Sequence, residues 1–182
     1  MKHVSLSWAL CGVLLFAGCG KHEVENLAAP SASATLDGKT GPMLTPQLNC
    51  GVSTRTSITV VVTAGATGAD AGFSLQWMPL ATYQANGGSW SEAQLCKASF
   101  SGNARDSRYR LAAGQSVAVT VGNLVLDNGA STHCPQALVC GTPYVFRIFA
   151  HANRSLNRSE FSAPFVCSTL GCTQVPGSPA PL

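Results

Sequence analysis

Short runs in which apolar side chains occupy every second position recur between residues 46 and 172. They lie at residues 57–62, 71–78, 116–121, 144–150 and 161–167. Clusters of Gly, Asn, Asp and Ser separate the runs, and helical periodicity is missing. A period of two is typical of strands that bury one face. Since such strands must hide their apolar faces against a second layer, the pattern predicts an all-β domain built as a two-sheet antiparallel β-sandwich.

The composition narrows the classes of protein that remain. Of the 182 residues, 46% are hydrophobic and only 10% are charged. The low charged fraction argues against a coiled coil, a charged disordered tail or a helix bundle, and the hydrophobic fraction is enough for a core. A net charge of +3 is too small for binding to nucleic acid by phosphate neutralisation. The length suits one domain with an appendage, and we expect the protein to be a monomer.

Residues 1–18 predict a signal peptide rather than part of the fold. Lys2 and His3 form a short basic start, and an apolar run follows at residues 4–17. This run is too short to cross about 30 Å of hydrocarbon as a stable helix, but it suits a secretory signal. We expect no other segment to span a bilayer.

The end of this run, at residues 15–19, reads Leu-Phe-Ala-Gly-Cys and places two small residues directly before a cysteine. It resembles the lipobox of bacterial lipoproteins, although Phe16 stands where that family most often has Leu. The resemblance implies cleavage before Cys19, acylation of Cys19 and anchoring to the cell envelope, at the outer membrane if the cell has two membranes. The alternative is an ordinary secretory peptide that leaves Cys19 as a spare thiol.

Three segments follow the signal. Residues 19–45 comprise the lipidated Cys19 and a flexible tether with few large apolar side chains. Residues 46–172 form the folded domain. Residues 173–182, which are rich in proline, form a disordered tail.

The segment from Leu138 to Thr169 resembles the end of a fibronectin type III domain, a member of the immunoglobulin-like sandwiches. The matching residues are Leu138, Gly141-Thr142, Tyr144, Ala152-Asn153, Ser162 and Pro164. The resemblance implies that Tyr144 forms a tyrosine corner, in which its hydroxyl returns to the backbone just upstream. It also implies a role in binding, spacing or adhesion.

The chain departs from that family in three ways. The tryptophan common on the second strand is absent, and we expect Trp77 on the third strand to fill the central volume. The segment from residue 78 to residue 114 is longer than the family needs. Six cysteines in the domain are also unusual for it.

These cysteines predict three disulfides, because an even count in an exported domain is typical of a disulfide framework. They are Cys50, Cys96, Cys134, Cys140, Cys167 and Cys172. In a sandwich of this type, all but Cys96 gather at one pole. Our first hypothesis pairs Cys134 with Cys140, and Cys50 with Cys167 or Cys172. The alternative, a metal site of His133, Cys134 and Cys140, lacks the usual spacing of zinc ligands.

No catalytic motif stands out, and no cofactor is predicted. The carboxylates of the domain are scattered over turns and strand ends, so nothing pairs two of them across a cleft. They belong to Asp70, Glu92, Asp106, Asp127 and Glu160. We therefore predict no catalytic residues and no metal ligands.

Two arginine clusters and one tryptophan form the candidate ligand surface. They comprise Arg105, Arg108, Arg110, Arg154, Arg158 and Trp90. We expect both arginine clusters toward the pole remote from the cysteines, where a combined basic face could bind an anionic glycan. The simpler interpretation of each cluster is a solvated loop. The sequence does not decide between an exposed and a buried Trp90.

The sequence therefore predicts a membrane-anchored, non-catalytic envelope lipoprotein that acts as a binding, adhesion or structural module. Its expected partners are the membrane, through the lipid anchor, and an envelope protein or an anionic glycan, but no nucleic acid. The alternatives are a carbohydrate-binding β-sandwich module and a small exported enzyme.

Overall fold

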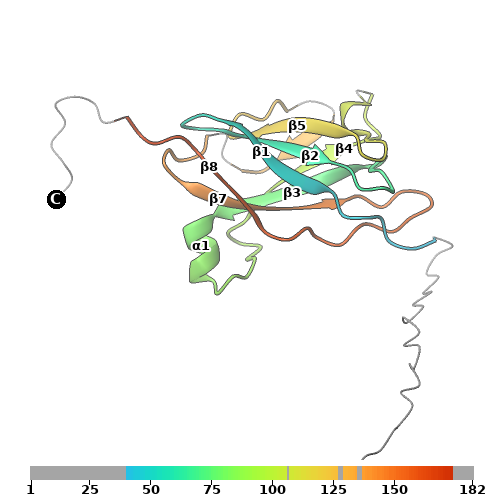
Figure 1. The fold of residues 1–182 in the computed structure, drawn as a ribbon, viewed down its shortest axis with the longest axis horizontal. Coiled ribbons are helices and arrows are strands. Elements are labelled where there is room, and N and C mark those ends of the chain that lie inside the picture. Colours follow the sequence, from blue (N-terminus) through green and yellow to red (C-terminus); the bar gives the residue numbers. More distant parts are fainter. Residues whose placement is uncertain (1–39, 106, 127–128, 135–136, 174–182) are drawn as a thin grey trace, which may run out of the picture. The chain divides into compact units, whose positions relative to one another are not determined.

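The computed structural model describes residues 40–105, 107–126, 129–134 and 137–173 (Figure 1). The predicted signal peptide, Cys19, most of the tether and nearly all of the tail lie outside the described residues. Within the described part of the chain, no helix has the length and apolar character needed to cross a membrane.

Two antiparallel sheets make up the domain (Figure 1). The smaller sheet has the order β1-β2-β5 and consists of β1 (Gln47–Ser53), β2 (Ile58–Thr63) and β5 (Ser116–Val121). The larger has the order β6-β4-β3-β7-β8 and consists of β3 (Gly72–Pro79), β4 (Cys96–Ser101), β6 (Ala130–Thr132), β7 (Pro143–Ala150) and β8 (Phe165–Ser168). The predicted all-β, two-sheet sandwich is confirmed.

The core lies between the two sheets and follows the predicted alternation. On β2, buried and half-buried residues alternate along the whole strand, and Ile58, Val60 and Val62 are fully buried. On β3, Phe73 and Leu75 face them with no exposed surface. Trp77 is 2% exposed and belongs to the same core, as expected for the residue that fills its centre.

The long segment between β3 and β4 contains an element that the sequence pattern did not predict. It begins with a short helix, α1 (Leu80–Ala85), which contacts β7. Its side chains pack with Met78, Leu95 and Val145 in a second, smaller cluster. A helix of six residues is too short to show a 3.6-residue period, so no helical pattern is visible there.

Tyr144 makes the hydrogen bond predicted for it. The backbone N–H of Val139 donates to the Tyr144 hydroxyl over 2.9 Å, and Tyr144 itself is buried. The bond ties the loop before β7 to the beginning of that strand.

Three disulfides cross-link the domain, in agreement with the predicted number. Cys50–Cys167 joins β1 to β8 and therefore joins the two sheets, with the Cα atoms 5.8 Å apart. Cys96–Cys134 joins β4 to the segment after β6, and Cys140–Cys172 joins the loop before β7 to the segment after β8. We call the end of the sandwich that carries these bonds the cysteine pole. Three disulfides indicate an oxidising, extracytoplasmic location.

The predicted Cys134–Cys140 bond is wrong. Cys134 follows β6, which pairs with β4, and this pairing brings Cys134 to Cys96. Cys140 lies instead beside the end of β8, where the N–H of Gly141 donates to the carbonyl oxygen of Leu170. Strand pairing across the sheet, rather than nearness along the chain, decides the partners. For Cys50, the structure selects Cys167 over Cys172.

Candidate binding face

The outer face of the larger sheet carries two cross-strand rows of side chains, all polar except Phe149 at the end of the first row. In the first row, Ser131 lies opposite Ser99, Ser99 opposite Ser74, and Ser74 opposite Phe149. In the second row, Lys97 lies opposite Gln76, and Gln76 opposite Arg147. Residues that are directly opposite on neighbouring strands share a face of the sheet. The rows thus form a continuous surface over four strands.

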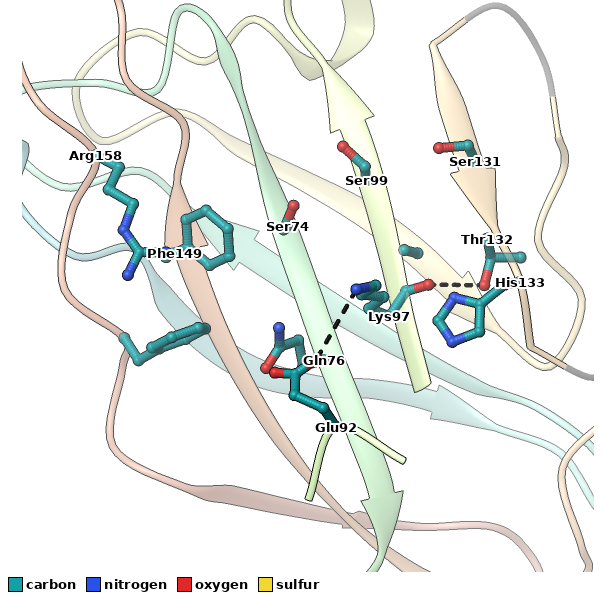
Figure 2. A pocket seen from close by; sticks show the side chains of 12 residues that line it. Ser74, Gln76, Glu92, Lys97, Ser99, Ser131, Thr132, His133, Phe149 and Arg158 are labelled. Carbon is teal, nitrogen blue, oxygen red and sulfur yellow. Dashed lines mark hydrogen bonds and ion pairs between the residues drawn. The ribbon is translucent and has the colours of Figure 1, made fainter. Parts of the chain in front are cut away.

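The three serines make a low floor, because their side chains are much shorter than those around them. A hollow of about 660 Å³ lies over this floor. Figure 2 shows Phe149 and Arg158 on one side of the serines and Thr132 and His133 on the other. Phe161 also lines the hollow. We call this hollow the serine trough.

Glu92 and Lys97 bring opposite charges to the serine trough (Figure 2). The Lys97 Nζ atom lies 3.9 Å from Glu92 Oε2, and the two side chains are 55% and 70% exposed. An exposed pair of this kind contributes about 0–1 kcal/mol to stability. A charged ligand can therefore replace either partner of the Lys97–Glu92 pair at little cost in free energy.

A stack of guanidinium groups and rings forms one wall. The Arg147 guanidinium carbon lies 4.4 Å from the Trp90 ring centroid and 3.8 Å from that of Phe161. Arg147 Nε also donates a 2.7 Å hydrogen bond to Gln76 Oε1. Arg158 lies 5.0 Å from the ring centroid of Phe149. These cation–π contacts hold both guanidinium groups in defined positions.

Burial lowers the pKa of the Arg147 guanidinium, with desolvation as the largest cause, while the Glu92 carboxylate acts in the opposite direction. Arginine nevertheless remains charged at neutral pH. The wall therefore carries a fixed positive charge beside the floor of the trough.

His151 fixes the serine at the centre of the floor. Its Nδ1 lies 3.2 Å from the carbonyl oxygen of Ala71, and its Nε2 lies 2.8 Å from Ser74 Oγ. Since a carbonyl only accepts, we assign the proton to Nδ1, and the Ser74 hydroxyl then donates to Nε2. Burial lowers the pKa of His151 and outweighs the bond to Ala71, which raises it. The neutral ring thus orients Ser74.

The predicted ligand residues do not share one surface. Arg110 and Arg154 line a second hollow with Asp70 and Asn153, at the end of the sheet remote from the cysteine pole. Arg158 lies at the serine trough instead.

The other two arginines lie elsewhere. Arg108 lies against the Tyr109 ring and lines a hollow beside β5. Arg105 is exposed in the loop after β4, next to Asp106, which is outside the described residues.

Trp90 is half-buried, so its exposure lies between the two alternatives left open for it. One neighbour is the Tyr83 ring, at a centroid distance of 5.3 Å, and another is the Arg147 guanidinium. Trp90 therefore packs against the guanidinium wall.

Sequence reasoning missed the serine row, Arg147, Phe149 and Phe161. Arg147 and Phe149 occupy alternate positions of a predicted strand, opposite to its buried side chains, which was the available signal. Ser74 occupied a position of the same kind in the predicted strand at residues 71–78, but the alignment of the three serines could not be predicted, because it depends on the register among three strands.

The alternative metal site does not form. Cys134 and Cys140 belong to two different disulfides, so neither offers a thiolate. Among the described residues, no group of three or more His, Cys, Asp or Glu side chains could hold a metal ion.

No protein-family model matches the chain, and no curated protein matches it.

Proposed function

We propose that this chain is an exported lipoprotein whose sandwich domain is a non-catalytic binding module of the cell envelope, used for adhesion or envelope structure. The three disulfides support export, and the lipobox-like residues 15–19 support an anchor on Cys19. In this proposal, the tether holds the domain at the membrane while the domain binds a component of the envelope.

The strand order supports a fibronectin type III-like identity for the domain. In immunoglobulin-like sandwiches, strands A, B and E share one sheet and strands C, F and G share the other. Here β1, β2 and β5 correspond to the first set, and β3, β7 and β8 to the second. The two additional strands, β4 and β6, extend the larger sheet beside β3. The Tyr144–Val139 hydrogen bond is a further point of agreement.

The serine trough is the single observation that carries the binding role. The interior of the domain is closed by large apolar side chains, whereas this outer face is open and hollow, with polar side chains between two aromatic rings and the edge of the sheet. Its floor is built from hydrogen-bonding groups, and the guanidinium groups of its wall are already positioned by rings. Pre-positioned polar groups around a concave surface are typical of ligand sites.

Filling the floor of the trough tests this role. Full-length protein, purified in detergent, is passed over immobilised envelope extract as wild type, Ser99→Trp and Ser168→Trp. Ser168 is an exposed strand serine at the cysteine pole and serves as the matched control. We expect retention of the wild type and the control but not of Ser99→Trp. Equal retention of all three would refute a binding role for this face.

The anchor is tested separately by mass spectrometry of the N-terminal peptide. We expect this peptide to begin at Cys19 and to carry acyl groups. A peptide that begins elsewhere, or an unmodified Cys19, would refute the anchor but leave the binding role standing.

A further inference from the structure

We propose that the serine trough binds an acidic polysaccharide, a sugar chain whose units carry carboxylate groups. This inference rests on the binding role proposed above and adds the chemical class of the ligand. Three properties of the trough support it: its charge, its floor and its place in the sheet.

The charge of the trough favours an anion. Among the described residues that line it, two side chains carry a positive charge, Lys97 and Arg158, and one carries a negative charge, Glu92. Arg147 adds a further positive charge within the wall. The guanidinium carbon of Arg158 lies 5.0 Å from the Phe149 ring centroid, and this contact favours a position beside the trough before any ligand binds. A guanidinium group can bind a carboxylate through two parallel hydrogen bonds.

The floor of the trough favours a ligand rich in hydroxyl groups. The hydroxyls of Ser99 and Ser131 can both donate and accept a hydrogen bond, as a sugar hydroxyl does, whereas that of Ser74 donates to His151 and can accept from a ligand. From Phe149 on β7 to His133 beyond β6, the trough spans three strand spacings, or about 14 Å. This width accommodates a sugar chain lying in the trough, with its carboxylates toward Arg158 and Lys97.

The position of the trough in the sheet argues against an acidic peptide. Peptides that add to a sheet use unpaired backbone groups at an edge strand. The floor instead lies on the face of the sheet, over the interior strands β3 and β4 and over Ser131 of the edge strand β6. β3 pairs with β4 and β7, and β4 pairs with β3 and β6. Only side chains are therefore available on this face, and they match the hydroxyl and carboxylate groups of a sugar chain.

The test measures binding of full-length protein in detergent to two acidic polymers, polygalacturonate and alginate. Two further probes are polygalacturonate with its carboxyl groups reduced to alcohols, and poly-glutamate. We expect binding to the acidic polysaccharides, at least ten-fold weaker binding to the reduced polymer, and no binding to poly-glutamate. Isothermal titration calorimetry gives the affinities.

Two variants locate the site. Arg158→Gln and Lys97→Gln should each weaken binding to polygalacturonate about ten-fold, which corresponds to about 1.4 kcal/mol. The matched control is Arg154→Gln. Arg154 is an exposed arginine in the hollow that it lines with Arg110, and this variant should bind as wild type does. Thermal unfolding of each variant verifies that the fold is retained.

Each contrary result overturns a defined part of the proposal. Equal binding to native and reduced polygalacturonate overturns the requirement for carboxylates, and tighter binding to poly-glutamate overturns the choice of a sugar chain. Binding to neither acidic polysaccharide overturns the inference as a whole. If Ser99→Trp still abolishes retention on the envelope extract, the binding role survives. Equal loss in Arg154→Gln overturns the assignment to the trough.

Discussion

The two faces of β3 and β7 differ sharply, although their residues alternate along the same strands. Toward the smaller sheet, Phe73, Leu75 and Trp77 are buried in one apolar core. Toward the outside, Ser74 and Arg147 carry polar groups at the serine trough and its wall. The inner face fixes the stability of the sandwich, whereas the outer face carries chemistry that the core does not need.

The outer face is itself divided along the strands. Near the cysteine pole, α1 and the loop after it cover Met78 and Val145, which are fully buried. Further along β3, none of the segments that the structure describes covers Ser74 with apolar side chains. An outer face thus closes only where a connecting segment brings apolar side chains to it, and the uncovered part remains available to a ligand.

The largest expected effect comes from the inner face. Trp77→Ala removes the ring at the centre of the core and should lower the free energy of unfolding by about 3–5 kcal/mol, through lost transfer energy and the cavity left behind. Ser99→Ala on the outer face of β4 should change it by no more than about 0.5 kcal/mol. Guanidinium chloride unfolding with the disulfides intact measures both. Similar losses in the two variants would contradict the contrast between the faces.

An intermediate effect is expected where the outer face is best packed. Arg147→Met removes a guanidinium that lies between two rings, and it leaves the Oε1 atom of the buried Gln76 without its donor. The free energy of unfolding should fall by about 1–3 kcal/mol. Arg154→Met, at an exposed position, should change it by less than about 0.5 kcal/mol. If both variants unfold alike, the stacked wall does not stabilise the fold.

The smallest expected effect is a change of the free energy of unfolding with pH. Burial lowers the pKa of His151 in the folded state below its ordinary value of 6.5. As the pH falls below 6.5, the unfolded chain takes up a proton before the folded chain does. The free energy of unfolding therefore decreases until the pH is below the folded pKa, where both states are protonated.

Denaturant unfolding at a series of pH values measures this decrease. His151→Gln should remove the contribution of His151, while His133→Gln, at the exposed histidine of the opposite wall, should retain it. A steeper loss of stability in His151→Gln than in the wild type would show that the sign is wrong.

The strands with a clear alternation could be predicted from the sequence, and those without it could not. The runs at 57–62, 71–78, 116–121 and 144–150 coincide with β2, β3, β5 and β7 within about two residues. The last strand is shorter than predicted and begins at Phe165, because Pro164 directly before it has no N–H for the ladder. β6 has only three residues and is too short to show a period. β4 was not predicted, although its apolar residues Cys96, Ala98 and Phe100 also occupy every second position.

The candidate site was predicted only in fragments. The arginine pattern pointed to Arg158, but also to four arginines that the structure places away from the serine trough. Sequence spacing identifies residues that share a loop. It does not show which loops lie over which face of a sheet.

The sequence by itself determined the period of two, and with it the division of each strand into an apolar and a polar face. It also determined the number of disulfides. Only the tertiary structure decided which cysteines pair and which polar residues meet. The physical reason is that alternation is a local property of the extended backbone, whereas the register between Ser74 and Phe149 depends on how strands far apart in the chain pack together.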